Sequence, residues 1–273
     1  MKPQKRREKI LGNTVNGTLM REALADVARE LLALEKKMRP QKRVTPAMLG
    51  IKPGQPIELC NEADLLLELT GWELDCRYRI LIGVLIQDCV NVTVQGGTVR
   101  NAANQPDPTS REMEVGHGFQ GNRGHGVRFD RCTSLYIPAD GQPRIEDHFN
   151  MIGVKNGVIN MCRASGPTTR SGTGFCIDVG CTNWQLFNST GDFLGPTGIT
   201  VCSGPGIIGG LAISGTTDAC ARFRSIEYGY PPIDPYVVIK SWKLTPRAGR
   251  RVDLEDGQER AIKFPFGDAG GVL

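Results

Sequence analysis

The sequence has few aromatic residues, few histidines and no long apolar run. Phenylalanine, tyrosine and tryptophan make up 6% of the 273 residues, and there are three histidines. No apolar run approaches the roughly 20 residues that a helix needs to cross a membrane. We therefore expect no membrane insertion. The charged N-terminus does not resemble a signal peptide.

The sequence also lacks paired cysteines and the common cofactor motifs. Its nine cysteines are an odd number, and none has the Cys-x-x-Cys spacing of a zinc site. A disulfide framework is not expected in a chain of this size. We expect reduced, mostly buried thiols, which imply that the chain folds in a cytoplasm. No phosphate-binding loop, nucleophile elbow or dinucleotide fingerprint is present. We expect no cofactor and no metal.

What the sequence does have is a loose internal repeat. Similar segments begin at Gly83, Gly126, Gly174 and Gly198, and a weaker copy begins at His148. From Gly126 onward these starting positions are 22, 26 and 24 residues apart. A period in this range is typical of one supersecondary unit that stacks on itself.

Within each unit, short runs alternate between apolar and polar residues. In the second unit Val127 and Phe129 are expected on one side of the chain, and Asp130 on the other. Alternation with a period of two predicts strands, and no helical pattern separates them. We therefore expect an all-β solenoid whose inward residues stack in apolar columns. Cys89 and Cys132 are expected to occupy equivalent positions in such a column.

The segment Asn91-Val-Thr-Val-Gln-Gly-Gly-Thr-Val-Arg-Asn101 resembles the strand, Gly-Gly turn and strand of pectate-lyase-like right-handed parallel β-helices. That family includes many bacteriophage tailspikes. The resemblance covers roughly residues 57–225 and implies a right-handed parallel β-helix. It says little about chemistry, because this architecture supports many functions.

Three domains are expected: 1–56, 57–227 for the β-helix, and a small β-like C-terminal extension at 228–273. The first begins with a basic arm that we expect to serve as an anchor, formed by Lys2, Lys5, Arg6, Arg7 and Lys9. A helix with a heptad pattern follows, and its apolar positions are Met20, Leu24, Val27, Leu31, Leu34 and Met38. This stripe either self-associates or caps the open end of the solenoid. Residues 39–56 are expected to form a proline-rich linker.

A longer interval in the repeat, from Gly83 to Gly126, predicts a projecting loop at 102–124. Such a loop on a rigid scaffold is a natural place for recognition. The extension at 228–273 does not follow the repeat period, and we expect it to cover an open end, to cross to another subunit or to attach to another protein.

Two aspartates are the candidate catalytic residues. If Asp130 and Asp178 share a repeat position two coils apart, their carboxylates lie roughly 10 Å apart. This is near the upper limit for inverting glycosidases. The alternative is that both are ordinary charges on an outer face. His117 and His125 lie in Gly-His-Gly triplets, but the motifs that accompany this element in polygalacturonases are missing.

The resemblance to tailspikes implies a structural bacteriophage protein rather than an enzyme. We expect a small homotrimeric spike or fibre that its N-terminal segment anchors to other virion proteins, such as capsid, portal or tail. It would be assembled in the host cytoplasm and located in the virion, with host cell-surface polysaccharide as a candidate ligand. The alternative is a polysaccharide-degrading β-helix enzyme, a glycoside hydrolase or a lyase, that uses outward-facing carboxylates.

Overall fold

The computed structural model describes residues 41–103, 105–106, 113–114, 116–224, 237–254 and 262–263. The chain divides into two units, Met1–Pro40 and Gln41–Leu273, and all described residues belong to the second. The expected basic arm and heptad helix therefore lie outside the described residues, and so do residues 104, 107–112 and 115 of the loop expected at 102–124. No helix in the described part is long and apolar enough to span a membrane.

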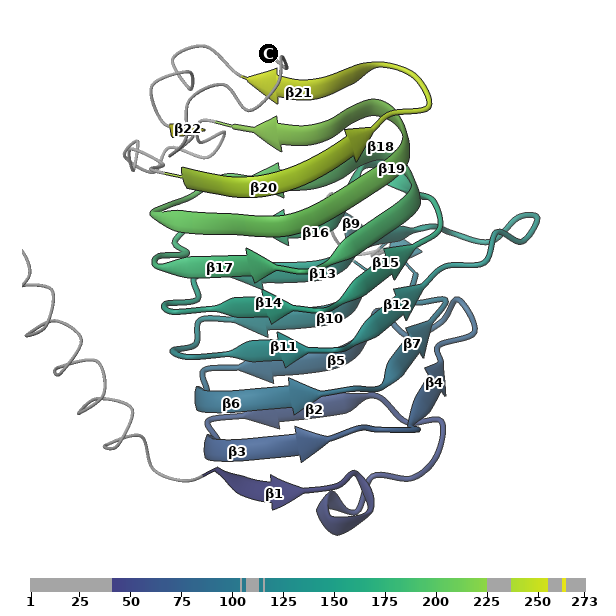
Figure 1. Cartoon of the computed structure of the whole chain (residues 1–273). Coiled ribbons are helices and arrows are strands. Elements are labelled where there is room, and N and C mark those ends of the chain that lie inside the picture. The colour runs from purple at the N-terminus through teal and green to yellow at the C-terminus, as the bar shows by residue number, and fades with distance from the viewer. Residues whose placement is uncertain are drawn as a thin grey trace, which may run out of the picture. The chain divides into compact units, whose positions relative to one another are not determined.

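The described chain is a parallel β-helix with three faces (Figure 1). The first face contains β2 (Ile57–Cys60), β5 (Ile82–Gln87), β10 (His117–Asn122), β13 (Ile145–Ile152) and β16 (Thr168–Ile177). It continues through the last parts of β18 (Thr190–Val201) and β19 (Gly206–Phe223) to β21 (Arg250–Leu254). Each strand pairs in parallel with the strand one coil away.

The second face contains β1 (Lys42–Val44), β3 (Ala63–Glu68), β6 (Val90–Gln95), β11 (Arg128–Asp130), β14 (Val158–Asn160) and β17 (Trp184–Phe187). It ends with the start of β19, the start of β20 (Val237–Thr245), and β22 (Ile262–Lys263). The third face contains β4 (Glu73–Asp75), β7 (Thr98–Arg100), β12 (Thr133–Leu135), β15 (Arg163–Ser165) and adjoining parts of β18, β19 and β20.

Two small elements stand outside this stack. The short strands β8 (Gln105–Pro106) and β9 (Met113–Glu114) pair with each other in an antiparallel ladder. A single 3₁₀ turn, η1 (Ala47–Leu49), follows β1.

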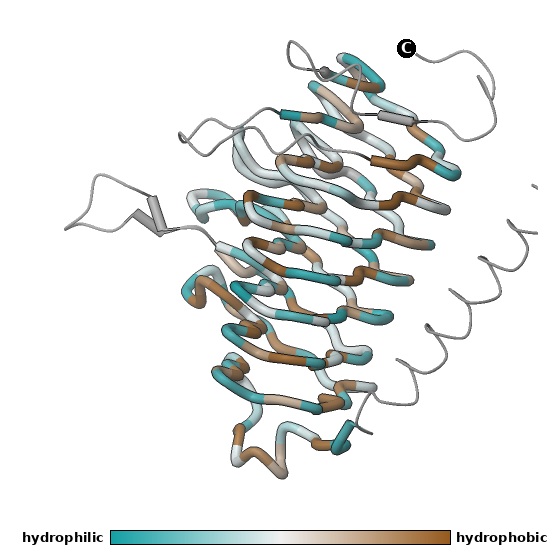
Figure 2. The backbone as a smooth tube through the Cα atoms, turned by 90° about the vertical axis from the view of Figure 1, so that its left-hand side faces the viewer, coloured by the Kyte–Doolittle hydropathy of each residue, from teal (hydrophilic) through white to brown (hydrophobic). Residues whose placement is uncertain are grey.

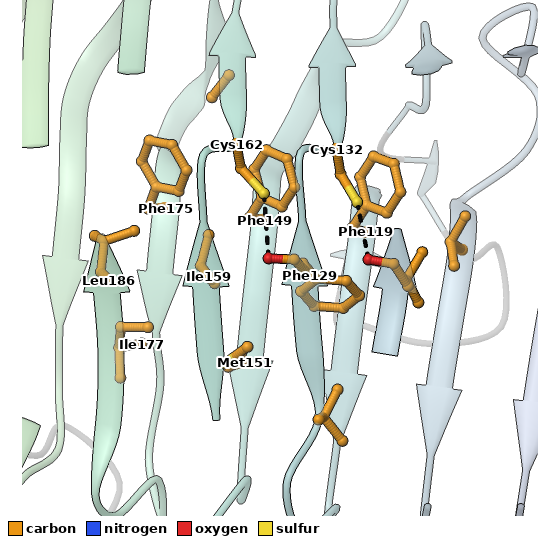
Figure 3. Packing of buried hydrophobic residues seen from close by; sticks show 14 of the residues in the cluster. Phe119, Phe129, Cys132, Phe149, Met151, Ile159, Cys162, Phe175, Ile177 and Leu186 are labelled. Atoms are coloured by element: carbon orange, nitrogen blue, oxygen red, sulfur yellow. Dashed lines mark hydrogen bonds between the residues drawn. The ribbon is translucent and has the colours of Figure 1, made fainter. Parts of the chain in front are cut away.

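The core is a set of columns in which the same inward position of each coil stacks on the next. Phe119, Phe149 and Phe175 form one such column, with ring centroids 5.1 and 5.4 Å apart and interplanar angles of 6° and 13°. Figure 3 shows these rings beside Cys132 and Cys162, whose thiols donate to backbone carbonyl groups of neighbouring coils. Apolar stretches recur from coil to coil in Figure 2. Stacking like side chains removes apolar surface from water and keeps the coils in register.

The thiols are free, as expected, and seven of the nine are buried, whereas Cys60 is exposed and Cys202 is half-buried. Cys132 and Cys89 do not share a position, however. Cys132 is aligned with Cys162 because β12 and β15 pair through the next residues. Cys89 is aligned with Gly124, since its neighbour Val90 pairs with His125.

The phase of the repeat was wrong in one unit. Gly83, His148, Gly174 and Gly198 are aligned along the first face, but the residue aligned with them in the second unit is Gly118. Gly126 lies one face further along the chain, beside Asn91. Alternation identifies strands without identifying their face, so two similar glycine-led segments were exchanged.

The stack also extends beyond the expected limits. At its start, β1 pairs with β3, so the coils begin before residue 57, inside the expected linker. At its end, β20 and β21 pair in parallel with β19. The described strands of 237–254 therefore continue the β-helix and do not form a separate extension.

Candidate functional site

The outer side of the first face carries two adjacent columns of polar side chains that are buried. Opposite residues in the first column are His117, Asp147, Thr173 and Thr197. Opposite residues in the second are Asn150, Cys176, Thr200 and Arg222. All have exposed fractions of 9% or less. On the third face, by contrast, the outward side chains of Glu73 and Arg163 are 59% and 56% exposed.

Asp147 is the centre of the first column. Its Oδ1 accepts a hydrogen bond from the backbone N–H of Thr173 at 3.0 Å, and its Oδ2 accepts one from Nδ2 of Asn150 at 3.0 Å. Nδ1 of His117 lies 3.5 Å from the same Oδ2. Three strands, β10, β13 and β16, therefore meet at one carboxyl group. The bond from Asn150 also shows that Asp147 points to the outer side, away from the inward ring of Phe149.

Burial controls the protonation of this pair. It raises the pKa of Asp147 to about 8, and the charges of Glu146 and Asp178 add to the rise, although the hydrogen bonds from Asn150 and Thr173 oppose it. Burial also lowers the pKa of His117 to about 3. Near pH 7 the pair is therefore largely a protonated carboxyl and a neutral imidazole. A buried pair in this state avoids the cost of an unsolvated charge.

His148 has a different role, because its ring lies inside the β-helix. Its Nδ1 is 2.9 Å from Oγ of Ser134, and its Nε2 is 3.0 Å from the carbonyl oxygen of Gly166. Since a carbonyl oxygen can only accept, Nε2 carries the proton and Nδ1 accepts from the serine. Burial lowers the pKa of His148 to about 4. This histidine satisfies polar groups between coils.

The two aspartates expected to form a pair are on different faces. Asp130 ends β11 on the second face, where it accepts a hydrogen bond from Asn160 at 2.6 Å and lies 3.5 Å from Arg128. Asp178 follows β16 on the first face, and burial raises its pKa. The expected alignment was therefore wrong, for the same reason as the phase of the second unit. A catalytic role for either residue stays a prediction.

A cleft of about 740 Å³ lies where the chain enters the last described strands of the first face. Its lining residues are Arg170, Ser171, Pro196, Thr217, Asp218, Arg222 and Arg224. Arg222 stands directly above Thr200 in the second polar column, so the cleft and the buried columns share one face. The cleft thus joins three guanidinium groups, two hydroxyl groups and one carboxylate.

Contacts at the cleft hold some of these groups in place. Arg222 donates through Nε to Asp253 at 3.1 Å and through Nη2 to Asp218. Ser171 donates to Glu146 at 2.7 Å. The Arg222 side chain is buried and clamped by two carboxylates, so its position is set before any ligand arrives.

Sequence reasoning missed both the Asp147 cluster and the cleft. Arg170 and Arg222 are 52 residues apart and belong to no motif. The signal that would have found them is the register, because the two polar columns appear only when strands are assigned to the correct face.

Comparisons with known proteins do not assign a family. No family model matches the chain, and no curated protein matches it. Among solved structures, PfbA, a surface adhesin of Streptococcus pneumoniae, is 14% identical with a TM-score of 0.49, and the match covers 78% of this chain and 57% of that one. The catalytic domain of a GH87 α-1,3-glucanase in complex with nigerose is 10% identical with a TM-score of 0.27, covering 82% and 62%. This chain thus spans less than two thirds of either.

Proposed function

We propose that this protein is a glycan-binding β-helical spike of a bacteriophage particle, attached through its N-terminal segment and acting without catalysis. The observation that carries the binding part is the cleft of about 740 Å³ on the outer side of a face built from stacked coils. Parallel ladders that run through every coil give such a face a fixed geometry. Binding residues held on a rigid scaffold lose little freedom when a ligand docks.

The viral part of the proposal rests on the sequence. The resemblance of 91–101 to tailspike β-helices, the basic N-terminal arm and the heptad stripe support a homotrimer that docks on other virion proteins. Light scattering coupled to sizing tests the assembly state of the full chain. We expect the mass of three chains, and a monomer at high concentration would contradict the trimeric spike.

The binding part is tested with a panel of bacterial surface polysaccharides. We expect retention of at least one glycan by the full-length protein, with no new reducing ends and no unsaturated products. If the panel contains the host polysaccharide and none of it is retained, the proposal of glycan binding is wrong.

A second candidate function, glycan hydrolysis, is favoured by one observation. Asp147 is protonated near neutral pH, as a general acid must be, and the charge of Asp178 contributes to raising its pKa. Against it, Asp147 is 6% exposed and already accepts two hydrogen bonds. If wild-type protein releases reducing ends and Asp147→Asn or Asp178→Asn abolishes the release without unfolding, the enzyme replaces the binding protein as the better account.

A further inference from the structure

The charge of the cleft points to the kind of ligand that it takes. Arg170, Arg222 and Arg224 line it together with a single carboxylate, that of Asp218. Asp253 and Glu146 contact Arg222 and Ser171 from outside this lining, so three carboxylates stand near the three guanidinium groups, and the positive character of the cleft rests on Arg170. Guanidinium groups present a planar fork of N–H donors that matches oxyanions, such as sulfate, phosphate and carboxylate groups.

Arg170 and Arg222, which both line the cleft, differ in how firmly their side chains are held. Arg222 is buried and held by Asp218 and Asp253. Arg170 is exposed and makes no side-chain ion pair or hydrogen bond within the described residues. The guanidinium group of Arg222 is therefore held in place before a ligand binds, whereas the Arg170 side chain is free to move toward a ligand. Ser171 and Thr217 also line the cleft with hydroxyl groups, and the Ser171 hydroxyl, which donates to Glu146, can still accept a hydrogen bond.

We propose that this cleft binds an oxyanion substituent of a sugar chain, with the guanidinium groups of Arg170, Arg222 and Arg224 on the anion and the hydroxyl groups of Ser171 and Thr217 on the adjoining sugar. The proposal rests on the proposed function for the sugar part of the ligand. Asp218 then acts as an internal competitor, because it occupies one edge of the Arg222 fork and repels an incoming anion.

This arrangement predicts that two substitutions change the affinity for the anion in opposite directions. Arg170→Gln removes a charged hydrogen-bond donor without an internal partner and weakens binding about tenfold, which corresponds to about 1.4 kcal/mol. Asp218→Asn removes the competing carboxylate and strengthens binding several-fold. Arg79→Gln is the control, because Arg79 is exposed like Arg170 but lies in the turn between β4 and β5, near the other end of the stack.

The experiment is titration calorimetry of the full-length protein with dextran sulfate, polygalacturonate and unsubstituted dextran, at low and high salt. We expect the two anionic polymers to bind, the affinity to fall as salt rises, and dextran not to bind. The comparison of dextran sulfate with polygalacturonate shows whether the cleft prefers sulfate or carboxylate groups. Circular dichroism of each variant confirms that it is folded.

Two outcomes overturn the inference. Either neither anionic polymer binds, or they bind and Arg170→Gln changes the affinity no more than Arg79→Gln does. The proposed function fails separately: a neutral host polysaccharide that is retained while the anionic polymers are not leaves glycan binding intact and removes only the oxyanion site. Retention of no glycan, charged or neutral, contradicts both.

Discussion

At the scale of single residues, the corners between faces place strong demands on the backbone. Each corner needs a residue with positive φ, and most are Gly, Asn or Asp, the residues that tolerate this conformation. Gly96, Arg131, Met161, Asn188 and Gly210 occupy one corner of successive coils, with φ between 49° and 76°. Met161 and Arg131 are the exceptions there, and their positive φ destabilises the folded state because both have a Cβ atom.

Replacing Met161 should therefore stabilise the protein. Met161 has a φ of 53° and its side chain is 51% exposed, so Met161→Asn removes strain without leaving a cavity. We expect a gain of about 0.5–1 kcal/mol in the free energy of unfolding. Urea denaturation measures it. Ile137→Asn is the control, since Ile137 is equally exposed but has no positive φ, and an equal gain there would contradict this explanation.

The buried carboxyl group of Asp147 makes stability depend on pH. Its pKa is raised to about 8 in the folded state, so the unfolded chain loses its proton at lower pH than the folded one. This group lowers folding stability as pH rises from about 4 to about 8, by up to about 1.4 kcal/mol per pH unit, and above about pH 6.5 the histidines no longer oppose the loss. His117 and His148 have lowered pKa values, so their effect is a loss of stability as pH falls below about 6.5.

Asp147→Asn tests this dependence of stability on pH, because asparagine keeps an acceptor for the Thr173 N–H but does not ionise. We expect the free energy of unfolding to fall less steeply between pH 6.5 and 8 in the variant, as followed by urea denaturation at several pH values. Asp140→Asn, at an exposed turn, should retain the wild-type decline. If Asp147→Asn retains it too, the buried carboxyl group is not its source.

At the scale of elements, β10 shows why a glycine-rich segment was mistaken for a loop. The expected loop at 102–124 contains several glycines, yet His117–Asn122 is a central strand. Gly118 is there because a Cβ would lie 2.2 Å from Oγ of Ser134 and 2.7 Å from the carbonyl oxygen of His148. Its small size gives His148 room inside the β-helix and does not mark a turn.

Two glycines of β10 provide a matched comparison. A Cβ on Gly121 would meet its nearest neighbour, Cγ1 of Val127, at 3.3 Å, a far milder contact than the one at Gly118. We expect Gly118→Ala to lower the free energy of unfolding by roughly 1–3 kcal/mol and Gly121→Ala to lower it by clearly less. Thermal and urea denaturation report both. Equal losses would show that the crowding at Gly118 is relieved elsewhere.

The alternation of apolar and polar residues predicted the strands, but it predicted only in part which strands share a face. Alternation correctly put Val127 and Phe129 inside, because an outward apolar residue would stay in water. It could not assign faces, because all three faces have the same period of two. Arg170 and Arg222 come together only through the pairing of β16, β18 and β19. That long-range register, which local pattern does not encode, determines the candidate site.

At the scale of the whole molecule, the described chain is one stack of coils whose first face joins a buried polar cluster to an arginine-lined cleft. The register of β10, β13, β16, β18 and β19 fixes both the buried polar columns and the cleft. A shift of one residue in one of these strands would therefore disrupt them. This register brings Arg170, Arg222 and Arg224 to the cleft that we propose as the binding site.

The decisive experiment is a crystal structure of the full-length protein soaked with a short sulfated dextran. We predict continuous parallel pairing from β2 to β21 along the first face, with a sulfate group in contact with the guanidinium groups of Arg170 and Arg222. A map in which Arg170 and Arg222 lie on different faces, or in which the sulfated sugar occupies another surface and leaves the cleft unoccupied, would contradict the account.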